Sequence, residues 1–214
     1  LIAINLREGD ELLKVKVTRG DADIIIVSQE GNAIKFNEQD VRPMGRTASG
    51  VKSMKLREND IAVCMDIAVD DEELLVISEN GYGKRTPVSE YKRQNRGGIG
   101  LITYKISEKT GKVVGAIVCK NDDELMLINT SGIAIRINVS DISVTSRSAM
   151  GVRLMRTSEE EKVVAIAKIA KTGDEEKDEQ LSLEACADNE VVEANKDTSL
   201  DRLVEESQKE ETEE

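Results

Sequence analysis

Short apolar runs separated by polar turns fill about the first 170 residues of the chain. In the first part of the sequence they cover residues 12–17, 23–28, 33–36 and 51–56, and they are rich in Val and Ile. Such residues favour strands, and runs of this length are too short for typical helices. The pattern predicts an all-β chain built from short strands.

The same pattern returns about every fifty residues, and we name the three copies the first, second and third units. One glycine marks the turn between the second and third strands of each unit, and another follows a longer loop. The turn glycines are Gly31, Gly81 and Gly132, and the loop glycines are Gly50, Gly100 and Gly151. Two anchors with one spacing indicate an array of a single supersecondary unit rather than unrelated turns that happen to contain glycine. We expect the turn glycines to adopt positive φ angles.

Four strands per unit favour four-stranded blades arranged around an axis, as in a β-propeller. Residues 1–6 align with a fourth strand and residues 163–169 with a first strand, so each end falls within a unit. We therefore expect a fragment of a larger ring that begins inside a preceding unit. The loop before each loop glycine is about 13 residues long, and loops of this length are often functional.

Charge divides the chain near residue 171. Of the 30 basic and 42 acidic residues, 4 and 17 lie in residues 172–214, which also lack aromatic residues. We expect residues 1–171 to form the β domain and residues 172–214 to be a disordered acidic tail. Two roles for this tail stay open: competition with other polyanions for cations of the domain, or solubility alone.

Composition disfavours several classes of function. The sequence has no histidine, which excludes His-based nucleophiles and the usual zinc sites but not carboxylate catalysis. No apolar stretch approaches about twenty residues and no secretory leader occurs, so neither a membrane span nor a signal peptide is expected. Cys64, Cys119 and Cys186 lack paired spacing and fit reduced thiols in a cytoplasmic protein, the first two as core residues.

Positive charge recurs at three places in every unit. These cations are Lys35, Arg85 and Arg136 after the turn glycine, Arg46, Arg96 and Arg147 before the loop glycine, and Lys55, Lys105 and Arg156 after it. Because equivalent positions in a radial array fall on one side, we expect rows of cations on one surface, which suits nonspecific duplex binding. The alternative is that they pair with Asp40, Glu90 and Asp141, which also recur in register. Aromatic residues make up only 2% of the chain, which favours contact with the nucleic-acid backbone over base stacking.

The loop of the second unit reads YKRQNRGGIG over residues 91–100. Its Gln94, Arg96, Gly97, Gly98 and Gly100 resemble the glycine-rich box of the C-terminal domain of bacterial DNA gyrase A. Asn95 and Ile99 stand where the family box has cations. The segment ENGYGKRTPVSEY, which adds Lys84 to the candidate DNA-binding residues, the fifty-residue repeat and the acidic end are also similar to that domain. The family's principal box lies in its first blade, so we expect this chain to hold later blades and the tail.

The resemblance implies a β-pinwheel, a propeller-like ring whose blades exchange strands, with a basic rim that wraps duplex DNA. It implies a non-catalytic part of a type II topoisomerase that introduces negative supercoils in an ATP-dependent manner. The implied partners are duplex DNA, the rest of DNA gyrase A and the DNA gyrase B protein, with no membrane. No cofactor or metal is expected in this chain, since ATP and Mg²⁺ would bind elsewhere in the holoenzyme.

Three interpretations stay open beside this one. The chain is also similar to the C-terminal domain of the A subunit of topoisomerase IV, and a propeller-like protein interaction scaffold is an alternative from another class. Gly97 and Gly98 would let backbone N–H groups approach a phosphate, or they only shape a tight loop.

Overall fold

The computed structural model describes residues 3–158 and 160–169, which belong to one compact unit. The acidic tail predicted for residues 172–214 lies outside the described residues. The strands of the first sheet are β1 (Asp23–Ser28), β2 (Asn32–Asn37), β3 (Ala62–Ala68) and β6 (Leu101–Ile102). Those of the second are β4 (Glu73–Ser78), β5 (Tyr82–Pro87), β7 (Val113–Cys119) and β10 (Val152–Arg153), and those of the third are β8 (Glu124–Asn129), β9 (Ala134–Asn138) and β11 (Val163–Ile169). Three short 3-10 helices, η1 (Glu38–Asp40), η2 (Val88–Glu90) and η3 (Val139–Asp141), follow the third strand of each unit.

Neighbouring units exchange strands. The sheet orders are β3-β1-β2-β6, β10-β5-β4-β7 and β11-β8-β9, with antiparallel pairing throughout. In the first sheet β1 and β2 come from the first unit, whereas the outer strands β3 and β6 come from the second. The same rule builds the second sheet from the second and third units. This arrangement confirms the all-β, propeller-like fold with exchanged strands.

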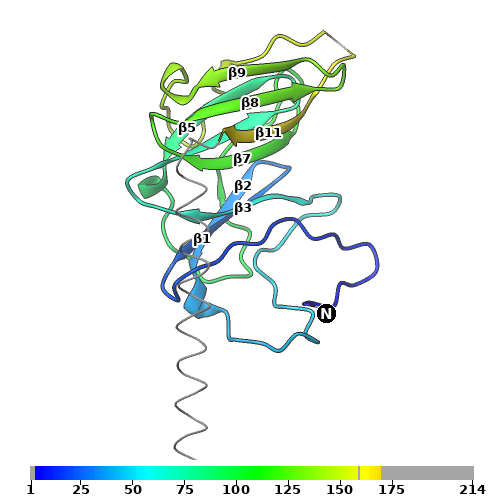
Figure 1. Ribbon diagram of the computed structural model, residues 1–214, viewed down its shortest axis with the longest axis vertical. Helices are drawn as coiled ribbons and strands as arrows, with labels where there is room; N and C mark the ends of the chain where they lie inside the picture. The colour runs from blue at the N-terminus through cyan, green and yellow to red at the C-terminus, as the bar shows by residue number, and fades with distance from the viewer. Residues whose placement is uncertain (1–2, 159, 170–214) are drawn as a thin grey trace, which may run out of the picture. The chain divides into compact units, whose positions relative to one another are not determined.

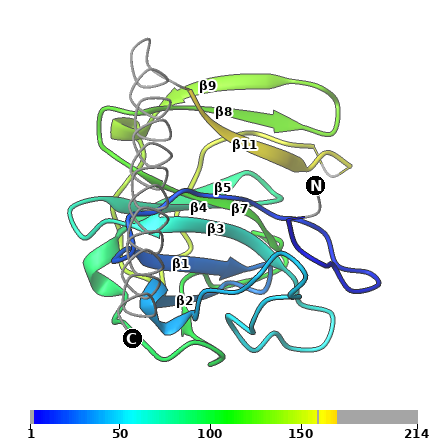
Figure 2. The ribbon, with the colours of Figure 1, turned by 60° about the horizontal axis from the view of Figure 1, so that its bottom comes forward.

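The first strands of successive units lie against one another. Strand β7 contacts β3 on one side and β11 on the other. Figures 1 and 2 show the sheets side by side, with β7 between β3 and β11. The predicted strand at residues 163–169 is confirmed as β11, which pairs with β8 of the third unit rather than standing alone.

Strands were predicted at residues 12–17 and 51–56 and at the start of the chain, and the described residues of these segments are not strands. Outer strands pair with central strands of the unit before, and no such central strands precede the first unit among the described residues. Without partners the backbone does not form ladders. Leu12 and Val15 consequently stay 61% and 72% exposed.

The turn glycines join one unit to the next. Gly31 and Gly81 have φ angles of 78° and 77°, as predicted. The carbonyl oxygen of Gly31 accepts hydrogen bonds from the backbone N–H groups of Thr103 and Tyr104, at 2.9 and 3.1 Å. A Cβ on Gly31 would overlap the carbonyl oxygen of Tyr104. A side chain at this position would therefore push neighbouring blades apart.

The core lies between adjacent sheets and joins residues of successive units. Val27 of β1 and Val76 of β4 are fully buried in one cluster with Tyr91 and Tyr104, so these two aromatic residues pack in the core. Burial raises the pKa of the Cys64 and Cys119 thiols to about 12, so both are unreactive core residues. Cys186 lies outside the described residues. Within the described part of the chain, no helix has the length and hydropathy needed to cross a membrane.

Candidate nucleic-acid interface

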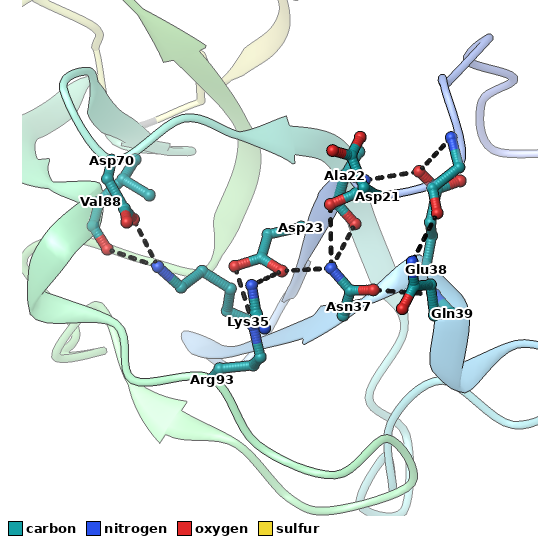
Figure 3. Close-up of polar contacts among 11 residues, drawn as sticks. Asp21, Ala22, Asp23, Lys35, Asn37, Glu38, Gln39, Asp70, Val88 and Arg93 are labelled. Carbon is teal, nitrogen blue, oxygen red and sulfur yellow. Dashed lines mark hydrogen bonds and ion pairs between the residues drawn. The ribbon is translucent and has the colours of Figure 1, made fainter.

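The cations that follow the turn glycines have different environments. Lys35 and Arg85 are buried, with 6% and 4% of their surface exposed, whereas Arg136 is exposed. The Lys35 ammonium pairs with the Asp70 carboxylate at 2.7 Å and donates to the carbonyl oxygen of Val88 at 3.5 Å (Figure 3). The hydrogen bond from Lys35 lowers the pKa of the Asp70 carboxyl. Lys35 thus ties the first sheet to the second unit.

Arg85 makes the corresponding connection one unit later. Its Nε donates to the carbonyl oxygen of Ile142 at 2.7 Å, and its Nη1 donates to Asn121 Oδ1 at 3.0 Å. Asp70 and Asn121 hold the same place in successive units. The prediction that these cations lie in an exposed row is wrong for Lys35 and Arg85, because both side chains are buried and bond to groups of the next unit.

Lys84 is fully buried, so it does not lie on a rim either. Its ammonium donates to the carbonyl oxygens of Ser146, at 2.6 Å, and Arg147, in the loop of the third unit. Burial lowers the pKa of Lys84 to about 8, although Glu90 nearby favours the charged form. Lys84 therefore joins two units and has no free path to a phosphate.

The glycine-rich loop at residues 94–100 lies against the segment that follows the loop glycine of the first unit. The N–H of Gly97 donates to the carbonyl oxygen of Ser53 at 2.6 Å, and the N–H of Lys55 donates to the carbonyl oxygen of Gly98 at 2.7 Å. Gly97 has a φ of 83°. Because its N–H is used within the protein, Gly97 fits the interpretation of a tight loop. The same bonds bring the exposed Lys55 of the first unit to the box of the second.

Arg96 and Arg147 are half-buried at equivalent junctions between units. Arg96 donates from Nε to the carbonyl oxygen of Asp40 at 2.9 Å and from Nη1 to that of Lys52 at 3.1 Å. Arg147 Nε lies 4.0 Å from the carboxylate of Glu90. The alternative of pairing with in-register acids thus applies to Arg147, while Arg96 uses the main chain of Asp40. Both guanidinium groups keep part of their surface in solvent.

The other predicted cations are exposed. They are Arg46, Lys55, Lys105 and Arg156, and none of the four forms an ion pair among residues 3–158 and 160–169. Arg136 is exposed and paired with Glu124. Gln94 is half-buried, and its backbone N–H donates to the carbonyl oxygen of Lys35 at 2.8 Å. The residues free to meet a polyanion are therefore those around the loop glycines, not those after the turn glycines.

Three exposed cations beside the box were missed in the sequence: Lys52, Lys92 and Arg93. Their positions are not basic in all three units, and the place of Arg93 is taken by Pro43 and Val144 in the other two. A search for recurring charge cannot find such residues. Only the folded structure shows that residues 91–100 lie against the first unit, through the bonds of Gly97 to Ser53 and of Lys55 to Gly98.

A polar pocket of about 510 Å³ lies beside the box, between the first and second units. Its lining residues are Asn37, Gln39, Asp40, Arg93, Gln94 and Asn95. Amide and guanidinium groups are common donors to phosphate oxygens. The pocket therefore has the chemistry of an anion site with one carboxylate, that of Asp40, at its wall.

Similarity to known proteins agrees with this geometry. Residues 1–19, 22–63, 72–120 and 123–170 match the family of the DNA gyrase C-terminal domain, a β-propeller. The A subunit of DNA gyrase from Clostridium acetobutylicum is 58% identical over 176 residues, which are 82% of this chain and 21% of that protein. Its counterpart from Staphylococcus aureus strain MRSA252 is 44% identical over 185 residues, or 85% of this chain and 21% of that protein. The chain thus spans about a fifth of the length of these curated relatives.

Two solved structures are similar in fold. The C-terminal domain of DNA gyrase A matches with a TM-score of 0.73 and 33% identity, over 79% of this chain and 58% of that one. The C-terminal domain of DNA topoisomerase IV matches with a TM-score of 0.74 and 26% identity, over 78% and 52%. With the family match covering most of the chain, this protein belongs to the family of DNA gyrase C-terminal β-propeller domains.

Proposed function

We propose that this chain is the non-catalytic part of a DNA gyrase A protein that binds and wraps duplex DNA. Its family membership and its 58% identity to a gyrase A protein support this role. The rest of gyrase A and the gyrase B protein would be its partners in a bacterial, cytoplasmic type II topoisomerase that introduces negative supercoils with ATP. ATP and Mg²⁺ would act elsewhere in that enzyme, since electrostatic binding of DNA needs no cofactor in this chain.

The main support for the proposal is the contact between Lys55 of the first unit and the glycine-rich loop at residues 94–100. The bond from Lys55 to Gly98 joins exposed cations of two successive units, and Lys105 and Arg156 hold the place of Lys55 in the next two units. A series of such junctions along an array offers phosphate contacts at regular intervals. Smooth bending of duplex DNA by 40–90° costs on the order of 1–6 kcal/mol, which several phosphate contacts can offset.

Binding is tested with the full chain on linear duplex DNA, by gel shift at a series of salt concentrations. We expect binding without sequence preference and a steep linear fall of log affinity with log salt concentration. A flat plot, or tight selection of one site, would contradict the proposal. Wrapping is tested by sealing a nicked circular plasmid in the presence of the chain. A change in linking number of constant sign is expected, and an unchanged linking number would mean binding without wrapping.

The C-terminal domain of the A subunit of topoisomerase IV is the second candidate, because its fold matches equally well. The higher identity to gyrase A favours gyrase. A protein interaction scaffold predicts no duplex binding at any salt concentration, which the same gel shift would show.

A further inference from the structure

Arg93 is a cation that only the second unit has at its place. Because the first and third units carry Pro43 and Val144 there, no structural requirement of the repeat explains the guanidinium. The backbone at this position nevertheless makes the same contact in two units. Arg93 forms a parallel β-bridge with Lys35 of β2, and Val144 forms one with Arg85 of β5. The side chain of Arg93 is therefore free to have a separate role.

The structure pairs this guanidinium with Asp23, the first residue of β1 (Figure 3). Arg93 Nη2 lies 2.8 Å from Asp23 Oδ1, and Arg93 Nε donates to Asp23 Oδ2 at 3.1 Å. Asp23 Oδ1 also accepts a hydrogen bond from Asn37 Nδ2 at 3.0 Å. Both carboxylate oxygens of Asp23 are thus engaged, which is the arrangement of a two-pronged arginine–carboxylate pair.

The two partners differ in freedom. The Arg93 side chain is 60% exposed and lies on a loop, whereas the Asp23 side chain is 13% exposed and is held on a strand by Asn37. The guanidinium can turn away into solvent while the carboxylate cannot follow. Because the guanidinium is exposed and Asn37 keeps its hydrogen bond to Asp23, separating the pair costs less than it would for a fully buried pair.

The polar pocket supplies a second place for the guanidinium. Arg93 is the one cationic residue among those lining the pocket, and Gln94 and Asn95 line it with side-chain amides. The amides of Asn37 and Gln39 already donate within the first unit, to Asp23 and to the carbonyl oxygen of Gly20. A phosphate oxygen competes with a carboxylate for the same arginine geometry. The carboxylate of Asp40 opposes an anion there, but Arg96 donates to the carbonyl oxygen of Asp40 and brings a second, half-buried guanidinium to the same residue.

We propose that Arg93 is a phosphate-binding residue whose guanidinium is occupied by Asp23 while DNA is absent. In the DNA-free chain its guanidinium pairs with Asp23, and when duplex DNA occupies the box it turns to a backbone phosphate at the pocket. Asp23 then acts as an internal competitor that lowers DNA affinity. This inference rests on the proposed function, because it names a contact and its regulation within the same interface.

The test is a double-mutant cycle on the full chain, measured as affinity for linear duplex DNA against salt concentration. Arg93→Gln is expected to weaken binding and to lower the slope of log affinity against log salt concentration by about one. Asp23→Asn is expected to raise affinity about two- to fivefold, the range of an exposed ion pair. In the Arg93→Gln background, Asp23→Asn is expected to change affinity far less, because there is no guanidinium left to release.

Asp21→Asn is the matched control. It removes the same charge from an exposed residue that lies two positions before Asp23. An equal gain from Asp23→Asn with and without Arg93, or an equal gain from Asp21→Asn, would show general charge repulsion and overturn the inference alone. Absence of duplex binding by the unaltered chain would overturn the proposed function as well. Circular dichroism and melting temperature check each variant, and Asp23→Ser replaces Asp23→Asn if the latter melts lower.

Discussion

Arg85 of β5 donates a hydrogen bond from Nε to the carbonyl oxygen of Ile142 across the boundary between the second and third units, at 2.7 Å. The same guanidinium bonds Asn121 and lies 3.8 Å from the carboxylate of Glu73. A cation that recurs in the repeat is therefore part of the joint between blades. The repeated cations therefore have two roles. Lys35 and Arg85, after the turn glycines, connect neighbouring units, whereas the cations around the loop glycines reach solvent.

Arg85→Gln is expected to destabilise the domain by about 3 kcal/mol, because it leaves the buried carbonyl oxygen of Ile142 without its donor and removes a buried charge that bonds two units. Arg136→Gln, at the equivalent exposed position, is the control and should change the free energy of unfolding by less than about 1 kcal/mol. Urea denaturation followed by circular dichroism measures both. Equal effects of the two substitutions would show that the joint does not depend on Arg85.

Lys84→Ile is expected to change how stability depends on pH. The folded pKa of Lys84 is about 8, below its ordinary value of 10.5, so between these pH values the unfolded chain binds a proton that the folded chain does not. Stability from this group therefore rises with pH across that window, by at most about 3 kcal/mol, and is lowest below pH 8.

Ile34 and Ile135 hold the place of Lys84 in the other units, so isoleucine fits this fold. Denaturation of both proteins at a series of pH values from about 7 to about 10 measures the difference in the free energy of unfolding. The variant should lack the rise seen in the unaltered chain. A constant difference across the series would mean that the buried ammonium does not titrate in this range.

Neutralising the exposed cations that follow the three loop glycines should weaken DNA binding without affecting the fold. The combined change Lys55→Gln, Lys105→Gln and Arg156→Gln is expected to lower duplex affinity uniformly across sequences and to reduce the salt slope by about 2 to 3. Its melting temperature should stay unchanged, since these side chains form no ion pair within the described residues. Arg19→Gln is the single-charge control outside the repeated positions. An unaltered salt slope in the triple variant would show that these three side chains do not contact DNA phosphates.

Gly100→Ala and Gly98→Ala separate the two roles of the box glycines. A Cβ at Gly100 would overlap the carbonyl oxygen of Ala33, and its φ is 82°, so we expect a loss of stability on the order of 1–3 kcal/mol. A Cβ at Gly98 meets no atom closer than 3.7 Å. Gly98→Ala should therefore fold normally, and weaker DNA binding by this variant would indicate close approach of a phosphate to the backbone. Unchanged affinity would leave the pair as shapers of the loop.

Deleting residues 172–214 tests the role of the acidic segment. If its 17 acidic side chains compete with phosphates for the same cations, deletion raises DNA affinity at low salt, and the gain shrinks as salt screens the competition. A role in solubility alone predicts equal affinity and more aggregation after deletion. Binding curves and light scattering at low and high salt concentrations distinguish the outcomes.

The sequence by itself determined the strands that pair within a unit, the repeat and the positive φ of Gly31 and Gly81. These features depend on local preferences: β-branched runs favour extended backbone, and glycine enters the left-handed region without strain. The motif around Gln94 and Arg96 also identified the family from the sequence, because the box is a contiguous segment. Each of these signals is contained within a few neighbouring residues.

Only the tertiary structure decided what each side chain faces. Strands at residues 12–17 need partners from another unit, so their sequence alone cannot make them pair. Arg85 is buried because the loop of the third unit covers it, whereas no loop of a following unit covers Arg136 among the described residues. Arg93 became a candidate only because folding sets it against Asp23, 70 positions earlier in the chain. Burial and ion pairing depend on distant segments, and the repeat pattern holds no information about which copy has a neighbour.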